Sequence, residues 1–208
     1  MKKIILFIVL AACSMITNAQ GFEAKKATEK KVIQSSYSPF YIGTSMGINN
    51  PYGFLALNFE VPIKNQFTIA HGFGISTWNT KFGLVAKYYT KPHCLGWAYG
   101  MGLTYSRGSA KFNAPNIPTT VGNQVVNKTV PLELIPQLNL CANAYKYWRI
   151  STNSRFYLHF GVSIAMSGTN KFNVLSTDKI TDDAKNSINA ISPGGLSLGL
   201  GFQFGSNP

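Results

Sequence analysis

Charged side chains are scarce in this chain. Asp, Glu, Lys and Arg make up 12% of its 208 residues, and only 7 residues are acidic. That charged fraction is about half of what soluble domains usually have. Aromatic residues reach 13%, and there are 19 glycines. The length suits one domain, and the composition argues against an ordinary cytosolic enzyme. It favours a protein with an outer face in contact with lipid and a narrow interior.

Long hydrophobic runs are also missing. Beyond the N-terminus, no apolar run reaches the roughly 18 residues that a membrane-spanning helix needs. Only helices and closed β-barrels satisfy their backbone polar groups inside hydrocarbon. If the chain lies in a membrane, it therefore does so as a barrel.

The N-terminus has the features of an export signal. A basic start and an apolar stretch over residues 4–12 precede small residues that suit cleavage. We expect residues 1–19 to be a signal peptide and residues 20–38 to be a polar leader. A second interpretation stays open, because Leu10-Ala11-Ala12-Cys13 has the form of a lipobox, which would make its cysteine a lipidated N-terminus. Both interpretations place the protein outside the cytoplasm.

The stretch from Gly195 to Phe204 alternates strictly between large apolar residues and small or polar ones. Because successive side chains of a strand point to opposite faces, this strand would have one apolar face. Seven other stretches repeat the alternation, at about 39–48, 53–63, 67–77, 81–90, 96–107, 129–140 and 155–168.

Residues 142–154 are the least clear part of the chain: they either extend the preceding strand to Ile150 or form a longer turn.

The connections between these strands are unequal. Those after the second and fourth strands are short, whereas two long loops, about 108–128 and 169–193, follow the fifth and seventh strands. Short turns at one end and long loops at the other are typical of outer-membrane barrels. The pattern predicts an all-β fold, an eight-stranded antiparallel up-and-down transmembrane β-barrel. It would cover residues 39–204 and leave a short tail, 205–208.

Aromatic residues gather near the predicted short-turn ends of the strands. Such a level is expected where a barrel crosses the lipid interface. We expect Tyr52, Trp78 and Tyr105 near the opposite rim. The predicted girdle at the short-turn end consists of Phe40, Phe67, Tyr88, Trp97, Tyr99, Trp148, Phe156, Phe202 and Phe204.

With these features, residues 39–204 resemble the small outer-membrane β-barrels typified by OmpX and the membrane domain of OmpA, in pattern rather than in close sequence. Such barrels end in a signal, polar-x-Gly-x-x-aromatic-x-aromatic, that the barrel assembly machinery reads. The matching residues are Ser197, Gly199, Phe202 and Phe204. Many family members end on the last aromatic, whereas four more residues follow it here.

The resemblance implies a location in the outer membrane of a Gram-negative bacterium. It also implies contact with outer-membrane lipid and lipopolysaccharide, and the barrel assembly machinery as a partner. We expect a monomer.

The predicted lumen face is mostly Gly, Ala and Ser, with a few polar side chains. The interior of an eight-stranded barrel is just wide enough for side chains to fill it. Glu60 and Lys87 fall on this face near the same end, and buried charges need partners. We therefore predict a lumen plug built on this pair, with Glu133 and His159 as further polar members. A narrow conduit for small solutes is the alternative.

Catalysis has weaker support. Some small barrels modify lipid A with a His, a Ser and a carboxylate. His159 and Ser163 share the lumen face, but four residues along a strand span roughly 13 Å, too far for a hydrogen bond. Asp178, Asp182 and Asp183 lack the spacing of a calcium loop. We therefore expect no enzyme activity, no cofactor and no metal site.

Three functions remain in order of preference. The first is a non-enzymatic protein with a structural or surface-interaction role through its long loops. The second is a narrow pore, and the third is a lipid A-modifying enzyme. A barrel fold alone does not decide among them.

Two cysteines remain after the signal segment. Cys94 and Cys141 both have lumen-side parity, and a register that pairs the flanking strands across their loop would set position 94 opposite about 142. A disulfide is then possible in an oxidising compartment, with two free buried thiols as the alternative.

The chain carries a formal net charge of +12. Basic clusters bind anionic headgroups, so we expect contacts to lipopolysaccharide phosphates near the long-loop rim. Ordinary solvated loop charge is the alternative. The positive charge is scattered, which argues against nucleic acid as a partner. The expected contacts are Lys81, Arg107, Lys111, Lys128 and Lys171.

Overall fold

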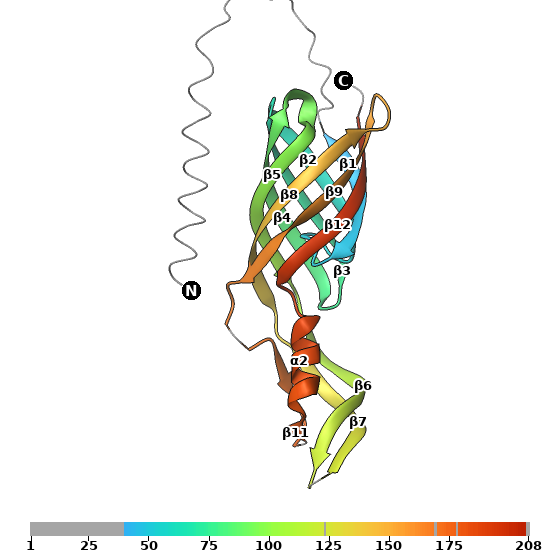
Figure 1. Ribbon diagram of the computed structural model, residues 1–208, viewed down its shortest axis with the longest axis vertical. Coiled ribbons are helices and arrows are strands. Elements are labelled where there is room, and N and C mark those ends of the chain that lie inside the picture. The colour runs from blue at the N-terminus through green and yellow to red at the C-terminus, as the bar shows by residue number, and fades with distance from the viewer. Residues whose placement is uncertain (1–39, 123, 169, 178, 207–208) are drawn as a thin grey trace, which may run out of the picture. The chain divides into compact units, whose positions relative to one another are not determined.

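Figure 1 shows the computed structural model of the chain. The predicted signal peptide (1–19), the leader (20–38) and Cys13 lie outside the described residues. Strands dominate the described chain and form two sheets. The described residues are 40–122, 124–168, 170–177 and 179–206.

Eight strands close into a barrel in the order β1-β12-β9-β8-β5-β4-β3-β2. Every neighbouring pair is antiparallel. The predicted eight-stranded antiparallel barrel is thereby confirmed. The strands are β1 (Tyr41–Ile48), β2 (Leu55–Lys64), β3 (Phe67–Ser76), β4 (Asn79–Lys91), β5 (Leu95–Ser106), β8 (Gln137–Arg149), β9 (Ser154–Ala165) and β12 (Gly195–Gly205).

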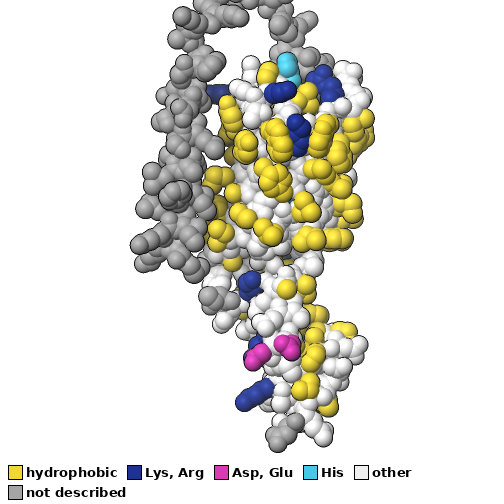
Figure 2. All heavy atoms as spheres, in the orientation of Figure 1, with side chains coloured by type: hydrophobic (Ala, Val, Ile, Leu, Met, Phe, Trp, Pro, Cys, Tyr) yellow, Lys and Arg dark blue, Asp and Glu magenta, His cyan; other side chains and the backbone are white. Residues whose placement is uncertain are grey.

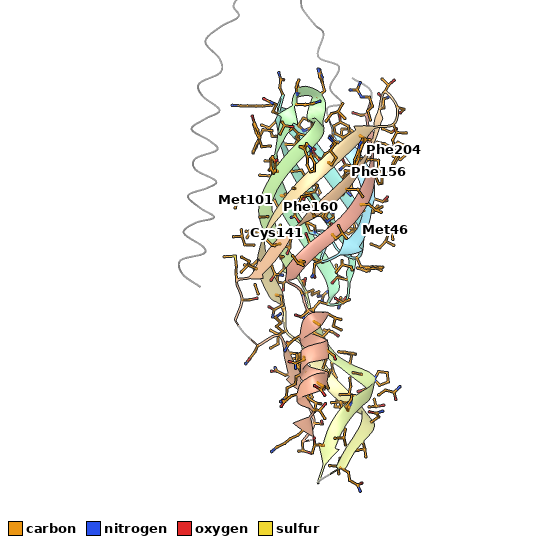
Figure 3. The ribbon with its side chains drawn as sticks, viewed as in Figure 1. Met46, Met101, Cys141, Phe156, Phe160 and Phe204 are labelled. Carbon is orange, nitrogen blue, oxygen red and sulfur yellow. The ribbon has the colours of Figure 1, made fainter. Side chains whose placement is uncertain are left out.

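Alternating side chains point to the lumen and to the outside of the barrel. In β12, Leu196 and Leu198 are exposed, whereas Ser197 between them is buried. Met101 and Phe160 likewise point outward from neighbouring parts of the wall (Figure 3). Hydrophobic side chains cover the visible face of the barrel in Figure 2. The outer surface is therefore apolar, and polar groups are gathered inside.

Aromatic side chains form continuous rows on the outer wall. Phe67, Tyr88 and Tyr99 lie directly opposite one another on β3, β4 and β5. A second row crosses β8, β9 and β12 and consists of Trp148, Phe156 and Phe202. These rows lie at the level predicted for the girdle.

The three aromatic residues expected near the opposite rim differ in exposure. Tyr105 is exposed there, but Tyr52 and Trp78 are each only 1% exposed. Tyr52 packs inside the barrel with Ala56 and Val85. The alternation of a strand does not predict whether Tyr52 or Trp78 is buried, because both lie in turns, where side chains have no fixed face.

The two ends of the barrel are unlike. Short connections, residues 65–66, 92–94 and 150–153, join strands at one end, which we call the short-turn end. The middle one is a single 3-10 turn, η2 (Pro92–Cys94). The first and last barrel strands also meet at this end, where Tyr41 pairs with Gly205.

At the other end, two long insertions build a second sheet, which we call the extension (residues 107–136 and 166–194). Its strand order is β10-β7-β6-β11. Its elements are β6 (Ser109–Val121), β7 (Gln124–Leu134), β10 (Phe172–Val174), β11 (Lys179–Ile180) and the helix α2 (Asp182–Ala190).

The extension has a hydrophobic core of its own. Trp78, from the β3–β4 turn, is buried in this core, and its indole Nε1 donates to the carbonyl of Ile135 at 2.9 Å. Thr181 caps α2 by accepting from the amide of Ala184 at 3.3 Å, a contact that stabilises helix N-termini. The other core residues are Ala114, Val130, Leu132, Leu134, Ile180, Ala184 and Ile188.

The extension corrects three predictions. In the described parts of the long loops expected at 108–128 and 169–193, the chain forms strands and a helix. The strand expected at 129–140 is two strands of different sheets, separated at Ile135-Pro136. The even-numbered residues from Val130 onward are apolar, as expected. However, Val130, Leu132 and Leu134 pack against α2 in the core of the extension, whereas Leu138 and Leu140 face outward from the barrel.

Candidate functional site

The carboxylate of Glu60 lies at the centre of a buried polar cluster in the lumen. Its Oε1 accepts from Thr68 Oγ1 at 2.8 Å and from the hydroxyl of Tyr89. Its Oε2 accepts from Nζ of Lys87 at 2.8 Å. A carboxylate has about four acceptor positions, so these contacts satisfy most of them. The strand pairing of Glu60 with Tyr41 places the cluster near the short-turn end.

Lys87 is fully buried opposite Glu60. Its Nζ also donates to the hydroxyl of Tyr147 at 2.9 Å and lies 4.5 Å from the centre of the Tyr145 ring, a cation–π distance. Because Glu60 is on β2 and Lys87 on β4, the ion pair spans the inner face of β3. The structure therefore brings together the two residues on which the plug was predicted.

Arg155, which the sequence analysis did not single out, is the second cation of this cluster. Its Nη2 lies 3.1 Å from Oε1 of Glu60. Its Nε donates to Oε1 of Gln203 at 2.9 Å, and its Nη1 donates to the carbonyl of Cys94 at 2.8 Å. Its guanidinium carbon lies 3.6 Å from the centre of the Tyr41 ring. Arg155 and His159 are both odd-numbered residues of β9, so their shared inward parity was the sequence signal that could have identified Arg155.

Four tyrosines pack around these charges. The ring of Tyr147 lies 5.1 Å from that of Tyr89 and 5.0 Å from that of Tyr157, measured between centroids. Tyr145 completes the group, and all of them are buried. We call Glu60, Lys87, Arg155 and these tyrosines the lumen plug. Their packing leaves the short-turn end of the lumen filled with side chains.

The other two expected plug residues have different positions. His159 is buried beside the plug, with its ring 5.5 Å from that of Tyr145. Glu133 is not in the lumen: it belongs to β7 of the extension, where its Oε2 accepts from Nδ2 of Asn173 at 2.9 Å. The prediction for Glu133 was wrong because β7 is a strand of the extension and not of the barrel.

The lumen beyond the plug is lined by polar atoms without protein partners. Thr104 Oγ1, Ser163 Oγ and both side-chain polar atoms of Asn139 are buried and make no hydrogen bond to any described residue. The same holds for both ring nitrogens of His159, so no His–Ser contact forms. Buried groups of this kind generally bind water. This part of the lumen therefore suits water or a small polar ligand.

The cysteines do not form the expected disulfide. Cys94 and Cys141 are both free and buried. The pairing of β5 with β8 sets Gly102, not position 94, opposite Cys141, because the strands begin to pair at Ser106 and Gln137. Burial raises the pKa of the Cys94 thiol, in the turn, to about 11.

The five basic residues expected at the rim divide into two groups. Lys81 is 2% exposed and points into the barrel, which corrects its assignment as a surface contact. The others belong to the extension: Arg107 and Lys111 are exposed, Lys128 is half-buried, and Nζ of Lys171 donates to Ser192 Oγ at 2.6 Å.

The residues of the expected assembly signal lie in β12. Ser197 points inward and donates to Oδ1 of Asn143 at 2.5 Å. Gly199 also faces the lumen, where a Cβ would come within 2.5 Å of the His159 ring. The rings of Phe202 and Phe204 lie 4.6 Å apart on the outer side.

The described residues contain neither a cluster of metal-binding side chains nor a membrane-spanning helix. No three His, Cys, Asp or Glu side chains come close enough together there to hold a metal ion. None of the helices in that part of the chain has the length and apolar character to cross a membrane.

Comparison with known proteins finds similarity among solved structures only at the level of the fold. No protein-family model matches the chain, and no curated protein matches it. Among solved structures, the chain is similar to the N-terminal β-barrel domain of Pseudomonas aeruginosa OprF, with a TM-score of 0.44 and 10% sequence identity. The match covers 81% of this chain and 98% of that one.

Proposed function

We propose that this protein is a non-enzymatic β-barrel of a Gram-negative outer membrane that presents its extension at the cell surface, where it has a structural or surface-interaction role. The observation that carries the proposal is the hydrophobic core of the extension, which makes it an ordered platform. A closed barrel below it supplies the anchor.

The outer surface of the barrel supports a membrane location. Most of its outward residues are Leu, Ile, Val, Met and aromatic side chains, such as Leu84, Leu103 and Ile164. Removing one such side chain from water stabilises by roughly 1.5–3 kcal/mol, so a whole wall of them favours hydrocarbon strongly. The aromatic rows near the short-turn end match the level of a lipid interface.

The unequal ends of the barrel support the orientation. In outer-membrane barrels the short turns face the periplasm and the long segments face outward. By that rule the short-turn end and the plug lie on the periplasmic side, and the extension lies outside. The arrangement agrees with export through an N-terminal signal.

The tip of the β6–β7 hairpin supports an interaction role. Val121, Val125 and Val126 are exposed there, and Phe112 is exposed further along β6. Apolar groups outside the hydrocarbon are costly unless a partner covers them. We therefore place the contact surface of the extension on this hairpin.

A narrow pore has less support. The lumen plug occupies the short-turn end with an ion pair of 2.8 Å and packed tyrosines. The polar row beyond the plug favours water in the lumen, but a conducting path would also require the plug to open.

Sided labelling tests the proposal. We would introduce Val125→Cys at the hairpin tip and, as the matched control, Asn65→Cys in an exposed short turn. In intact cells, a membrane-impermeant maleimide should label Val125→Cys, and Asn65→Cys should react only after the outer membrane is permeabilised. Labelling of the turn but not of the hairpin in intact cells would overturn the orientation.

A further inference from the structure

Lys81 is a buried cation that lacks a counter-charge. Its side chain is 2% exposed, and no hydrogen bond or ion pair joins it to another described residue. The two other buried cations of the barrel, Lys87 and Arg155, share the carboxylate of Glu60. A buried charge is costly unless it is paired, so the surroundings of Lys81 need an explanation.

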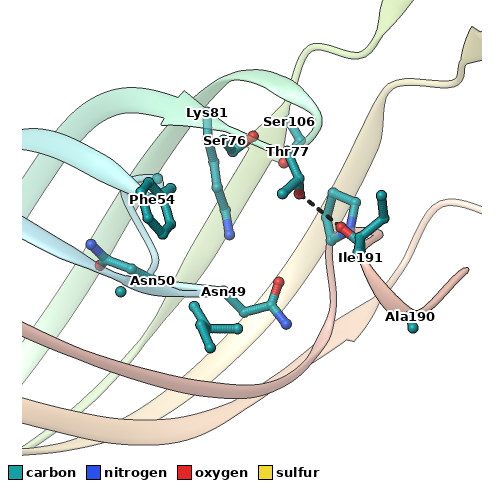
Figure 4. Close-up of a pocket in the computed structure, with 13 residues that line it drawn as sticks. Asn49, Asn50, Phe54, Ser76, Thr77, Lys81, Ser106, Ala190 and Ile191 are labelled. Atoms are coloured by element: carbon teal, nitrogen blue, oxygen red, sulfur yellow. Dashed lines mark hydrogen bonds between the residues drawn. The ribbon is translucent and has the colours of Figure 1, made fainter. Parts of the chain in front are cut away.

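Lys81 points into a cavity at the extension end of the barrel. The cavity has a volume of about 270 Å³ and lies between the β1–β2 loop, the β3–β4 turn and the segment that follows α2. Figure 4 shows the lysine reaching into it from β4. Among the described residues that line this cavity, Lys81 is the only charged one, and none is acidic.

Ser106 lies beside the lysine. The two residues are directly opposite each other on β4 and β5. Ser106 is fully buried, and its Oγ has no hydrogen-bond partner among the described residues. An ammonium group and a free hydroxyl donor therefore face the same space, and each gains if an anion accepts from it.

The remaining walls decide which anion fits. Asn49 and Asn50 use their side-chain amides to bond Gly194 and Ser45, so they close the cavity more than they offer donors to it. Apolar side chains supply much of the rest: Ile48, Phe54, Ala190, Ile191 and Pro193. One cation at the base of a largely apolar cavity suits a singly charged ligand with a compact apolar part.

We propose that this cavity binds a small organic carboxylate, with Lys81 as its counter-charge and Ser106 as a hydrogen-bond donor. The carboxylate oxygens would accept from Nζ and Oγ, and the apolar part would lie against Phe54 and Ile191. Binding involves no covalent step. It is separate from the surface role proposed for the extension.

Titration of the full-length protein, folded in detergent micelles, tests the proposal. The probes are sodium benzoate, inorganic phosphate and sodium chloride at matched ionic strength, and the readout is the NMR shift of the Ser106 and Asn50 amides. Benzoate should give a saturable shift. Lys81→Met should weaken its binding about tenfold or more, as expected when a charge-assisted hydrogen bond is lost. Lys111→Met, at an exposed position of the extension, is the control and should leave binding unchanged.

Each other result overturns the proposal. No saturable shift with benzoate would mean that water alone fills the cavity. Phosphate binding as tightly as benzoate would contradict the carboxylate class, and equal binding by Lys81→Met and the wild type would remove Lys81 from the site. If Lys81→Met does not fold, Lys81→Arg should retain binding and Ser106→Ala should weaken it, and the reverse order would equally contradict the proposal.

Discussion

Nζ of Lys87 lies 2.8 Å from Oε2 of Glu60, and neither side chain is exposed. The two residues come from strands that are not neighbours, since β3 lies between β2 and β4. Arg155 reaches the same carboxylate from β9, on another part of the wall. The ion pairs of Glu60 thus join three strands, β2, β4 and β9, across the lumen.

We expect Glu60→Gln to destabilise the barrel by about 3–5 kcal/mol, because it leaves two buried cations without a counter-charge. Urea unfolding in lipid vesicles measures this free energy. Glu133→Gln is the control: it removes a carboxylate that bonds a single side chain, Asn173, outside the lumen, and should cost far less. Equal effects of the two variants would contradict the role given to Glu60.

The plug predicts a closed lumen. In planar bilayers the wild-type protein should give no stable conductance steps, and the triple variant Glu60→Ala, Lys87→Ala, Arg155→Ala should give them. Lys111→Ala should behave like the wild type, because it alters an exposed position. Stable steps in the wild type that the triple variant leaves unchanged would show that another path conducts.

Because the extension has its own core, mutations in that core should destabilise the extension without unfolding the barrel. Leu132→Ala removes a side chain that is 1% exposed, and large-to-small changes in a core cost about 2–5 kcal/mol. Limited proteolysis should then cut the extension faster, while the barrel keeps its heat-dependent gel shift. Val125→Ala, at an exposed position, should change stability by no more than about 0.5 kcal/mol. Equal proteolysis of both variants would mean that the core does not order the extension.

The thiols give a chemical prediction. Burial raises the pKa of the Cys94 thiol to about 11, so at neutral pH this group is protonated and a poor nucleophile. Cys94 and Cys141 should resist alkylation in the folded protein and react after unfolding without reductant. Mass spectrometry would show this, and failure of both to react in unfolded, unreduced protein would restore the disulfide.

The sequence predicted most of the barrel because its outer and inner faces differ so clearly. In β5, Trp97, Tyr99 and Met101 face outward between Ala98 and Gly100, and the structure keeps that assignment. The pairing of Glu60 with Lys87 followed from the same parity and from the need of buried charges for partners.

The sequence did not predict the plug tyrosines of β8 or the strands of the extension, and the reasons are physical. In the second half of β8 the strand keeps its inward and outward positions, but the residue types at them change, since Ala144 and Lys146 point outward while Tyr145 and Tyr147 point inward. The expectation that large apolar residues face outward therefore failed in the stretch that supplies half of the plug tyrosines. In β7 the apolar row was real, but alternation does not say whether Leu132 meets lipid or a helix. Strands as short as β11 leave no periodic signal at all.

Whether the protein is a closed barrel in the outer membrane can be decided by fractionating the native host and running heated and unheated samples on a gel. We expect a band in the outer-membrane fraction whose mobility changes on boiling, because a closed barrel stays folded in detergent until it is heated. A soluble periplasmic protein whose mobility does not change would rule out the membrane location, and the apolar outer wall of the barrel would then need another function.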